Sequence, residues 1–96
     1  HAGVRVNAVA PGYTETPALQ IAIDRGDRDR TQLVKQAALG RMVQTDEVAC
    51  GIAFLLSDQA TAITGISLPI DCGWLASVGW ETYSGLPHTK QGTSSC

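Results

Sequence analysis

A short apolar run near the start of the chain constrains its fold most. From Val4 to Ala10 the sequence reads VRVNAVA, and Pro11-Gly12 ends the run. The run is nearly continuous and rich in β-branched residues, which is typical of a strand covered on both faces in a parallel sheet. The Pro-Gly pair predicts a turn directly after this strand.

Two helices are predicted after the turn. Pro17 suits the first position of a helix that continues to residue 23. Residues 24–30, DRGDRDR, carry charges of both signs that we expect to lie in solvent. The second helix is expected at about residues 31–39, and Gly40 is a suitable C-terminal cap for it.

The strongest periodic pattern in the chain predicts a longer third helix. Thr45 can cap its amino end, and Asp46 and Glu47 in the first turn favour the positive end of the helix dipole. The pattern ends near Ala60. The apolar positions that recur at helical spacing are Val48, Ala49, Ile52, Ala53, Leu55 and Leu56.

A second strand is predicted at residues 65–71, where Ile66, Leu68 and Ile70 alternate with polar residues or proline. Pro69 cannot donate a backbone hydrogen bond, so the strand is expected at a sheet edge. A strand, paired helices, a long helix and an edge strand imply a right-handed crossover between parallel strands. Two strands and one crossover bury little apolar surface, so the sequence predicts half of an α/β fold that needs further partners.

Composition and charge exclude several classes of protein. The 96 residues suit one small domain, and a net charge of −2 gives no electrostatic footprint for nucleic acid. No apolar run approaches the roughly 18 residues that span a bilayer, and no segment resembles a signal peptide. The cysteines are spaced for neither a disulfide framework nor a zinc site, which favours reduced thiols in a cytoplasmic protein; they are Cys50, Cys72 and Cys96.

Two long stretches, RVNAVAPGYTET and GRMVQTDEVACGIAFLLSDQATAITGISLPIDCGW, resemble the C-terminal part of the short-chain dehydrogenase/reductase family. The resemblance runs in order from about Gly3 to Trp74. It implies a doubly wound parallel sheet, with residues 1–75 as the C-terminal part of an NAD(P)-binding Rossmann domain. Residues 17–40 would form a mobile substrate lid, and residues 76–96 an aromatic and then frayed tail.

The resemblance also implies a cofactor site for NAD or NADP. Pro11 and Gly12 would shape a tight turn that lets the backbone approach the nicotinamide ring. The Thr14 backbone N–H would bind the carboxamide oxygen, and the Thr16 hydroxyl would bind the amide or the pyrophosphate. The alternative is that Thr14 and Thr16 only cap the following helix.

Other residues are given structural roles. Asn7 lies in the apolar strand, and its buried amide is expected to support neighbouring loops. Asp71-Cys72-Gly73 departs from the Asp-Gly-Gly usual in the family, so Cys72 strains the turn if that position needs a positive φ. In relatives the long helix and edge strand pack on a second subunit. Candidate interface residues are Leu55, Ile66, Leu68, Trp74 and Trp80, with burial inside the chain's own core as the alternative.

The chain does not carry the family's catalytic motifs. The fourth residue after Tyr13 is Pro17 and after Tyr83 is Pro87, so neither tyrosine belongs to a Tyr-x-x-x-Lys motif. We therefore predict no catalytic residue and no metal ligand here. The resemblance implies an oxidoreductase fragment whose parent enzyme, a dimer or tetramer, transfers hydride between nicotinamide and a small carbonyl or secondary alcohol. The alternative is a truncated, non-catalytic interaction module that binds full-length subunits.

Overall fold

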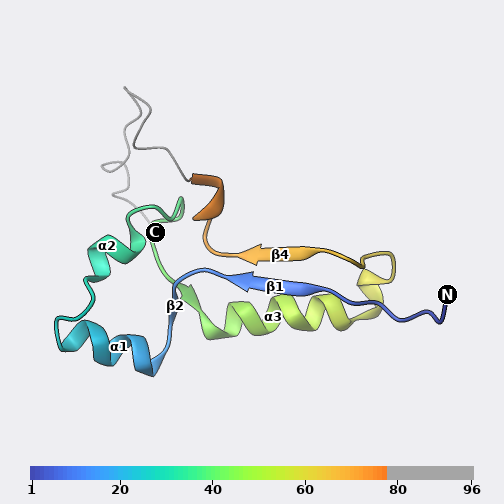
Figure 1. Ribbon diagram of the computed structural model, residues 1–96, viewed down its shortest axis with the longest axis horizontal. Helices are drawn as coiled ribbons and strands as arrows, with labels where there is room; N and C mark the ends of the chain where they lie inside the picture. The colour runs from blue at the N-terminus through green and yellow to red at the C-terminus, as the bar shows by residue number, and fades with distance from the viewer. Residues whose placement is uncertain (78–96) are drawn as a thin grey trace.

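The computed structural model of the chain describes residues 1–77 (Figure 1). Most of the predicted tail, residues 78–96 with Trp80, therefore lies outside the described residues. The order of helices and strands is β1 (Ala8–Pro11), β2 (Thr14–Glu15), α1 (Pro17–Asp24), α2 (Arg30–Val34), β3 (Val43–Gln44), α3 (Thr45–Leu56) and β4 (Ser67–Ile70). Short 3-10 turns follow α3 at Asp58–Ala60 and β4 at Leu75–Ser77.

The central unit is a parallel pair of strands, β1 and β4, joined through the long helix α3. Ala8 pairs with Ser67 and Pro11 with Ile70, and α3 runs along one side of the pair (Figure 1). The predicted α/β class and parallel pairing are thus present, although β1 begins only at Ala8. Pro69 lies in β4, which pairs with no described strand other than β1.

Asn7 ties the start of β1 to the loop before β4. Its Nδ2 donates to the Ile63 carbonyl over 3.0 Å, and its Oδ1 accepts from the Ile66 N–H over 3.2 Å. One side-chain amide therefore satisfies both a donor and an acceptor of the neighbouring loop. This is the structural role that the sequence predicted for Asn7.

The amino end of α3 differs from the sequence-based expectation. The N-cap of α3 is Gln44, not Thr45, and Gln44 and Glu47 form a reciprocal capping box. The two terminal nitrogens of Arg41, Nη1 and Nη2, donate to the Glu47 carboxylate over 2.8 and 2.9 Å. The hydrogen bonds from Arg41, followed by that from the Gln44 N–H, lower the pKa of Glu47 to about 2.

The second helix is shorter than predicted. It ends at Val34, and the chain then turns so that the Gly40 N–H reaches the Ala37 carbonyl over 2.8 Å. Gly40 does adopt a positive φ of 69°, which suits glycine, but it closes this later turn rather than the helix.

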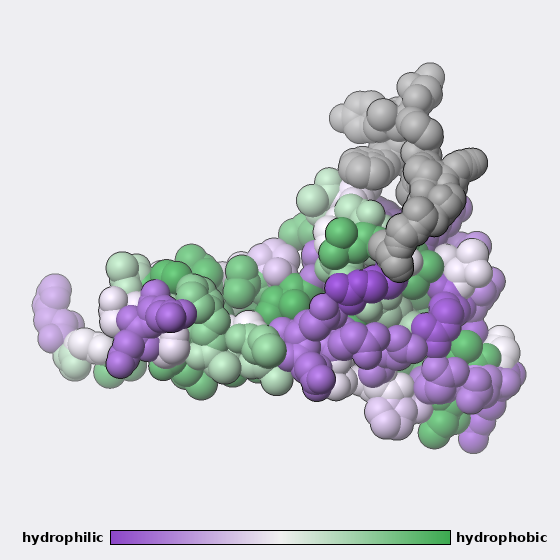
Figure 2. All heavy atoms as spheres, turned by 180° about the vertical axis from the view of Figure 1, so that it is seen from behind, coloured by the Kyte–Doolittle hydropathy of each residue, from purple (hydrophilic) through white to green (hydrophobic). Residues whose placement is uncertain are grey.

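Few apolar side chains are buried within residues 1–77. The buried ones are Leu33, Met42, Val43, Leu55 and Ala60, whereas several large apolar side chains just before β1 and on α3 are exposed, among them Val4, Val6 and Leu56. Figure 2 shows hydrophobic side chains gathered over the end of the molecule formed by β1, α3 and β4. The sheet thus presents apolar surface that needs a cover, as the sequence predicted for half of an α/β fold.

The candidate interface residues have different environments. Leu55 is only 6% exposed and lies in the chain's own core, so the alternative reading is correct for this residue. Ile66 is 41% exposed, while Leu68 and Trp74 are half-buried. Among the helices of residues 1–77, none is long and apolar enough to cross a membrane.

The turn after β4 contains a strained residue. Cys72 has a φ of 55°, and among the described residues it is the one non-glycine residue with a positive φ. The Asp71 carboxylate holds the turn by accepting from the Gly73 N–H over 2.9 Å and the Leu75 N–H over 3.1 Å. The position therefore does need a left-handed backbone, and the predicted strain at Cys72 is confirmed.

Replacing Cys72 with glycine is expected to stabilise the protein. A left-handed backbone costs an L-residue about 1–2 kcal/mol, and part of the relief is offset by the greater entropy of glycine in the unfolded chain. We expect a net gain of about 0.5–1 kcal/mol in the free energy of unfolding, measured by chemical denaturation. Cys72→Ala is the matched control, because it removes the thiol but keeps the strained Cβ. An equal gain from Cys72→Ala would contradict the strain explanation.

Candidate functional site

The predicted site lies where β1 and β4 end side by side. The Gly12 N–H donates to the Ile70 carbonyl over 3.0 Å, which ties the turn after β1 to the end of β4. A Cβ at position 12 would lie 2.8 Å from the Cβ and 2.9 Å from the Cα of Asp71. Only glycine fits this close approach, so Pro11-Gly12 forms the tight turn that the sequence predicted.

Thr14 is oriented by the short strand pair β2 and β3. The Tyr13 carbonyl accepts a 2.9 Å hydrogen bond from the Val43 N–H of β3. In a trans peptide the N–H points opposite to the carbonyl of the same peptide unit, so the Thr14 N–H points away from β3. The Thr14 hydroxyl donates to the Gly12 carbonyl over 2.9 Å, which folds the side chain back onto the turn. The hydrogen bond between Val43 and Tyr13 therefore directs the Thr14 N–H away from the β2–β3 ladder.

Thr16 caps α1. Its backbone is extended and its Oγ1 accepts from the Leu19 N–H over 3.2 Å, with Pro17 next in the helix. Thr16 therefore does cap α1, whereas Thr14 caps no helix. Capping uses one of the two lone pairs of the Thr16 oxygen, so the hydroxyl can still donate its hydrogen or accept a second hydrogen bond.

The structure adds Trp74 to the site. A pocket of about 360 Å³ at the ends of β1 and β4 is lined by Pro11, Gly12, Tyr13 and Trp74. The sequence placed Trp74 only among candidate interface residues. Its position directly after the Asp71-Cys72-Gly73 turn could have indicated that Trp74 belongs to the site, because that turn lies at the end of the sheet where the predicted site lies.

Glu15, between Thr14 and Thr16, is held by two neighbours. Gln44 Nε2 donates to Glu15 Oε1 over 2.9 Å, and Arg30 Nη2 lies 3.0 Å from Glu15 Oε2. The hydrogen bond from Gln44, followed by that from Arg30, lowers the pKa of the Glu15 carboxyl, which favours the carboxylate. Glu15 is therefore an anchor of the loop rather than a proton donor.

The loop can bind a group that is both a hydrogen-bond donor and an acceptor. It offers a backbone N–H at Thr14 and a hydroxyl at Thr16 next to an apolar pocket. A flat ring that carries an amide has matching chemistry, since the ring suits the pocket and the amide carries both a donor and an acceptor. Within residues 1–77, no three His, Cys, Asp or Glu side chains gather closely enough to hold a metal ion.

Comparison with protein families gives an extensive match. The sequence profile of a family described as "Enoyl-(Acyl carrier protein) reductase" matches residues 1–75. The cis-4-hydroxycyclohexanecarboxylate dehydrogenase of Sinomonas cyclohexanicum is 45% identical over 74 residues, which are 77% of this chain and 28% of that protein. Other similar proteins from Sinorhizobium fredii and Burkholderia thailandensis bear the name short-chain dehydrogenase/reductase.

Solved structures agree in fold. ElxO with NADP bound has a TM-score of 0.71 and 38% identity, and the match covers 77% of this chain and 30% of that one. A structure described as ribose-5-phosphate isomerase from Brucella melitensis has a TM-score of 0.81 and 45% identity, covering 88% of this chain and 33% of that one. That description names a different activity, so this match supports the fold alone. The chain spans about a third or less of each of these proteins.

Proposed function

Because the chain belongs to the short-chain dehydrogenase/reductase family, we propose that it forms the C-terminal part of an NAD(P)-dependent oxidoreductase. We call that longer polypeptide the parent enzyme. Its reaction is hydride transfer between the nicotinamide and a carbonyl or secondary alcohol carbon of a small substrate. This chain contributes the loop for the nicotinamide, the substrate lid at residues 17–40 and part of a subunit interface.

The orientation of the Thr14 N–H is the observation that carries this proposal. Because the Tyr13 carbonyl is bound by β3, the Thr14 N–H points outward and can donate to the carboxamide oxygen of the cofactor. The Thr16 hydroxyl accepts from the amide NH2 through its second lone pair, or donates to the pyrophosphate, while still capping α1. When bound, the nicotinamide supplies or accepts the hydride. The bound NADP in ElxO, a relative by fold and sequence, supports this choice of cofactor.

Subunit association and location are further parts of the proposal. The exposed Ile66 and the half-buried Leu68 lie in or next to β4, where a second subunit of a dimer or tetramer would cover them. The spacing of the cysteines suits neither a disulfide framework nor a zinc site, which supports a reducing, cytoplasmic location.

The exposed apolar residues just before β1 and on α3 favour one second candidate function. A truncated product with this surface would bind full-length subunits without catalysing a reaction. In that case the chain would elute from a sizing column together with a full-length relative, rather than alone.

Substitution of Thr16 tests the binding loop. Thr16→Val removes the hydroxyl and with it one hydrogen bond to the amide or the pyrophosphate of the cofactor. We therefore expect dinucleotide affinity in the parent enzyme to fall about tenfold. Lost capping should lower stability by about 1 kcal/mol. Thr16→Ser keeps the hydroxyl and should retain near-normal affinity, measured by direct titration with NADPH and NADH. If Thr16→Val lowers stability but leaves the affinity of the folded enzyme unchanged, Thr16 is only a cap.

A further inference from the structure

Two arginines return to the cofactor loop, Arg28 from the segment between α1 and α2 and Arg30 from the start of α2. The Arg28 guanidinium lies 5.5 Å from the ring centroid of Tyr13, within the range of a cation–π interaction. Arg30 Nη2 lies 3.0 Å from Glu15 Oε2. Tyr13 and Glu15 are the two residues that flank Thr14. The loop is therefore held on both sides of the residue whose N–H is directed outward.

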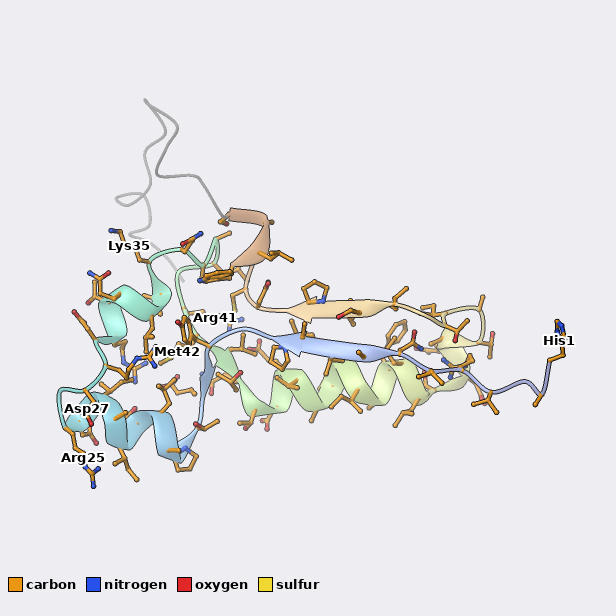
Figure 3. All side chains as sticks on the ribbon, viewed as in Figure 1. His1, Arg25, Asp27, Lys35, Arg41 and Met42 are labelled. Carbon is orange, nitrogen blue, oxygen red and sulfur yellow. The ribbon has the colours of Figure 1, made fainter. Side chains whose placement is uncertain are left out.

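The Glu15 carboxylate joins four structural elements at one point. It belongs to β2, and it accepts from Gln44 of β3 over 2.9 Å and from Arg30 of α2. Arg30 Nη2 also donates to Gln20 Oε1 of α1 over 2.8 Å. The two helices of the proposed lid are thus connected to the cofactor loop through polar side chains, whereas the exposed turn with Arg25 and Asp27 lies at the far end of the lid (Figure 3).

The two arginine contacts lie immediately before and after Thr14. Tyr13 directly precedes β2 and meets Arg28, while Glu15 ends β2 and meets Arg30. Rotating the peptide units on either side of Thr14 would displace Tyr13 or Glu15 from its arginine. The contacts with the lid therefore resist the motion that would turn the Thr14 N–H away from a ligand.

We propose that Arg28 and Arg30 act as positioning residues that couple the lid to dinucleotide binding by fixing the loop on either side of Thr14. This inference rests on the proposed function of the loop. Neither arginine touches the dinucleotide in this account; each acts through Tyr13 or Glu15. Dinucleotide binding and lid closure then favour each other, because both need the same loop conformation.

The expected effects are modest because the contacts are partly solvated. The side chains of Arg30 and Glu15 are 43% and 32% exposed, and ion pairs of this kind change a binding equilibrium by about two- to fivefold. We therefore expect Arg30→Gln and Glu15→Gln each to raise the dissociation constant of NADPH or NADH about two- to fivefold. The dissociation constant of the double variant should be no higher than that of the more affected single variant, because either single substitution already breaks the pair.

The experiment is a double-mutant cycle in the parent enzyme, read as the dinucleotide dissociation constant by direct titration. The charge-swapped variant E15R/R30E re-forms the pair. Gln44 can still hydrogen-bond an arginine at position 15, because its amide oxygen accepts where its amide nitrogen donated to Glu15. It should restore at least part of the affinity. Glu47→Gln is the matched control, because Glu47 also pairs with an arginine, Arg41 at 2.8 Å, with its side chain 40% exposed. That control should lower stability without changing the dissociation constant.

Three results would overturn the inference. Additive effects of the two single substitutions, with no recovery in the charge-swapped variant, would show that the Glu15–Arg30 pair does not act on the dinucleotide. A loss of thermal stability in Arg30→Gln with an unchanged dissociation constant would show a merely structural pair. In both cases the unsubstituted parent enzyme binds dinucleotide, so the proposed function stands. If the unsubstituted parent enzyme binds neither NADH nor NADPH, the proposed function and this inference fail together.

Discussion

The isolated 96-residue chain is expected to give no dinucleotide-linked turnover with ketones or secondary alcohols. Reduction of a carbonyl needs a positioned acid that delivers a proton to the oxygen as the hydride reaches carbon. Tyr13 and Tyr83 each have proline, not lysine, four residues later, so the chain has no tyrosine in the motif that lowers the pKa of this acid. In the proposed function the chain contributes binding groups, and the proton donor comes from another part of the parent enzyme.

The measurement is the near-ultraviolet absorbance of NADPH in the presence of purified chain and a panel of carbonyl compounds. A full-length relative such as the acetoacetyl-CoA reductase of Allochromatium vinosum, 41% identical over 71 residues, serves as the positive control. The chain should match the buffer blank. A rate that rises in proportion to the concentration of the chain would show that its own residues suffice for catalysis.

Replacing Gly12 with alanine is expected to cause the largest loss among single substitutions. The added Cβ would lie 2.8 Å from Asp71 Cβ and 2.9 Å from Asp71 Cα, which is too close for either strand end to stay in place. Overpacking of this kind costs about 1–3 kcal/mol of stability. Because the displaced backbone leads directly to Thr14, we also expect dinucleotide affinity in the parent enzyme to fall at least about tenfold, measured by titration.

Gly26→Ala is the control for this substitution. Gly26 has a φ of 81° and no atom within 4 Å of an added Cβ, so alanine there strains only the exposed lid turn. It should cost about 1 kcal/mol or less and leave the ends of β1 and β4 undisturbed. Equal losses of affinity from Gly12→Ala and Gly26→Ala would mean that the close approach to Asp71 does not shape the binding loop.

Local sequence signals predicted the backbone of the site because they depend on few neighbours. Pro11-Gly12 marked the end of β1. The departure from Asp-Gly-Gly at Cys72 marked a position whose φ is indeed positive, at 55°. Asn7 in an apolar strand indicated a structural amide, and it bonds both Ile63 and Ile66. The turn at Pro11-Gly12 and the positive φ at Cys72 are local backbone requirements, whereas Asn7 was predicted because an amide in an apolar strand needs partners wherever they lie in the sequence.

The features that sequence did not predict depend on contacts between distant segments. Thr45 is a better intrinsic N-cap than Gln44, yet Gln44 takes the position because β3 and the capping box with Glu47 fix the chain there. The pairing of Glu15 with Arg30 depends on how α1 and α2 fold back onto β2, which no local pattern encodes. Trp74 joins the pocket only because β4 ends beside β1.

The central claim is that the outward N–H of Thr14 and the hydroxyl of Thr16 hold the nicotinamide end of the cofactor. The most direct test is a crystal structure of the parent enzyme with NADP or NAD bound. The account predicts the carboxamide oxygen about 2.7–3.2 Å from the Thr14 nitrogen, with the Thr16 hydroxyl bonded to the amide or the pyrophosphate. A nicotinamide ring bound away from both threonines would contradict it.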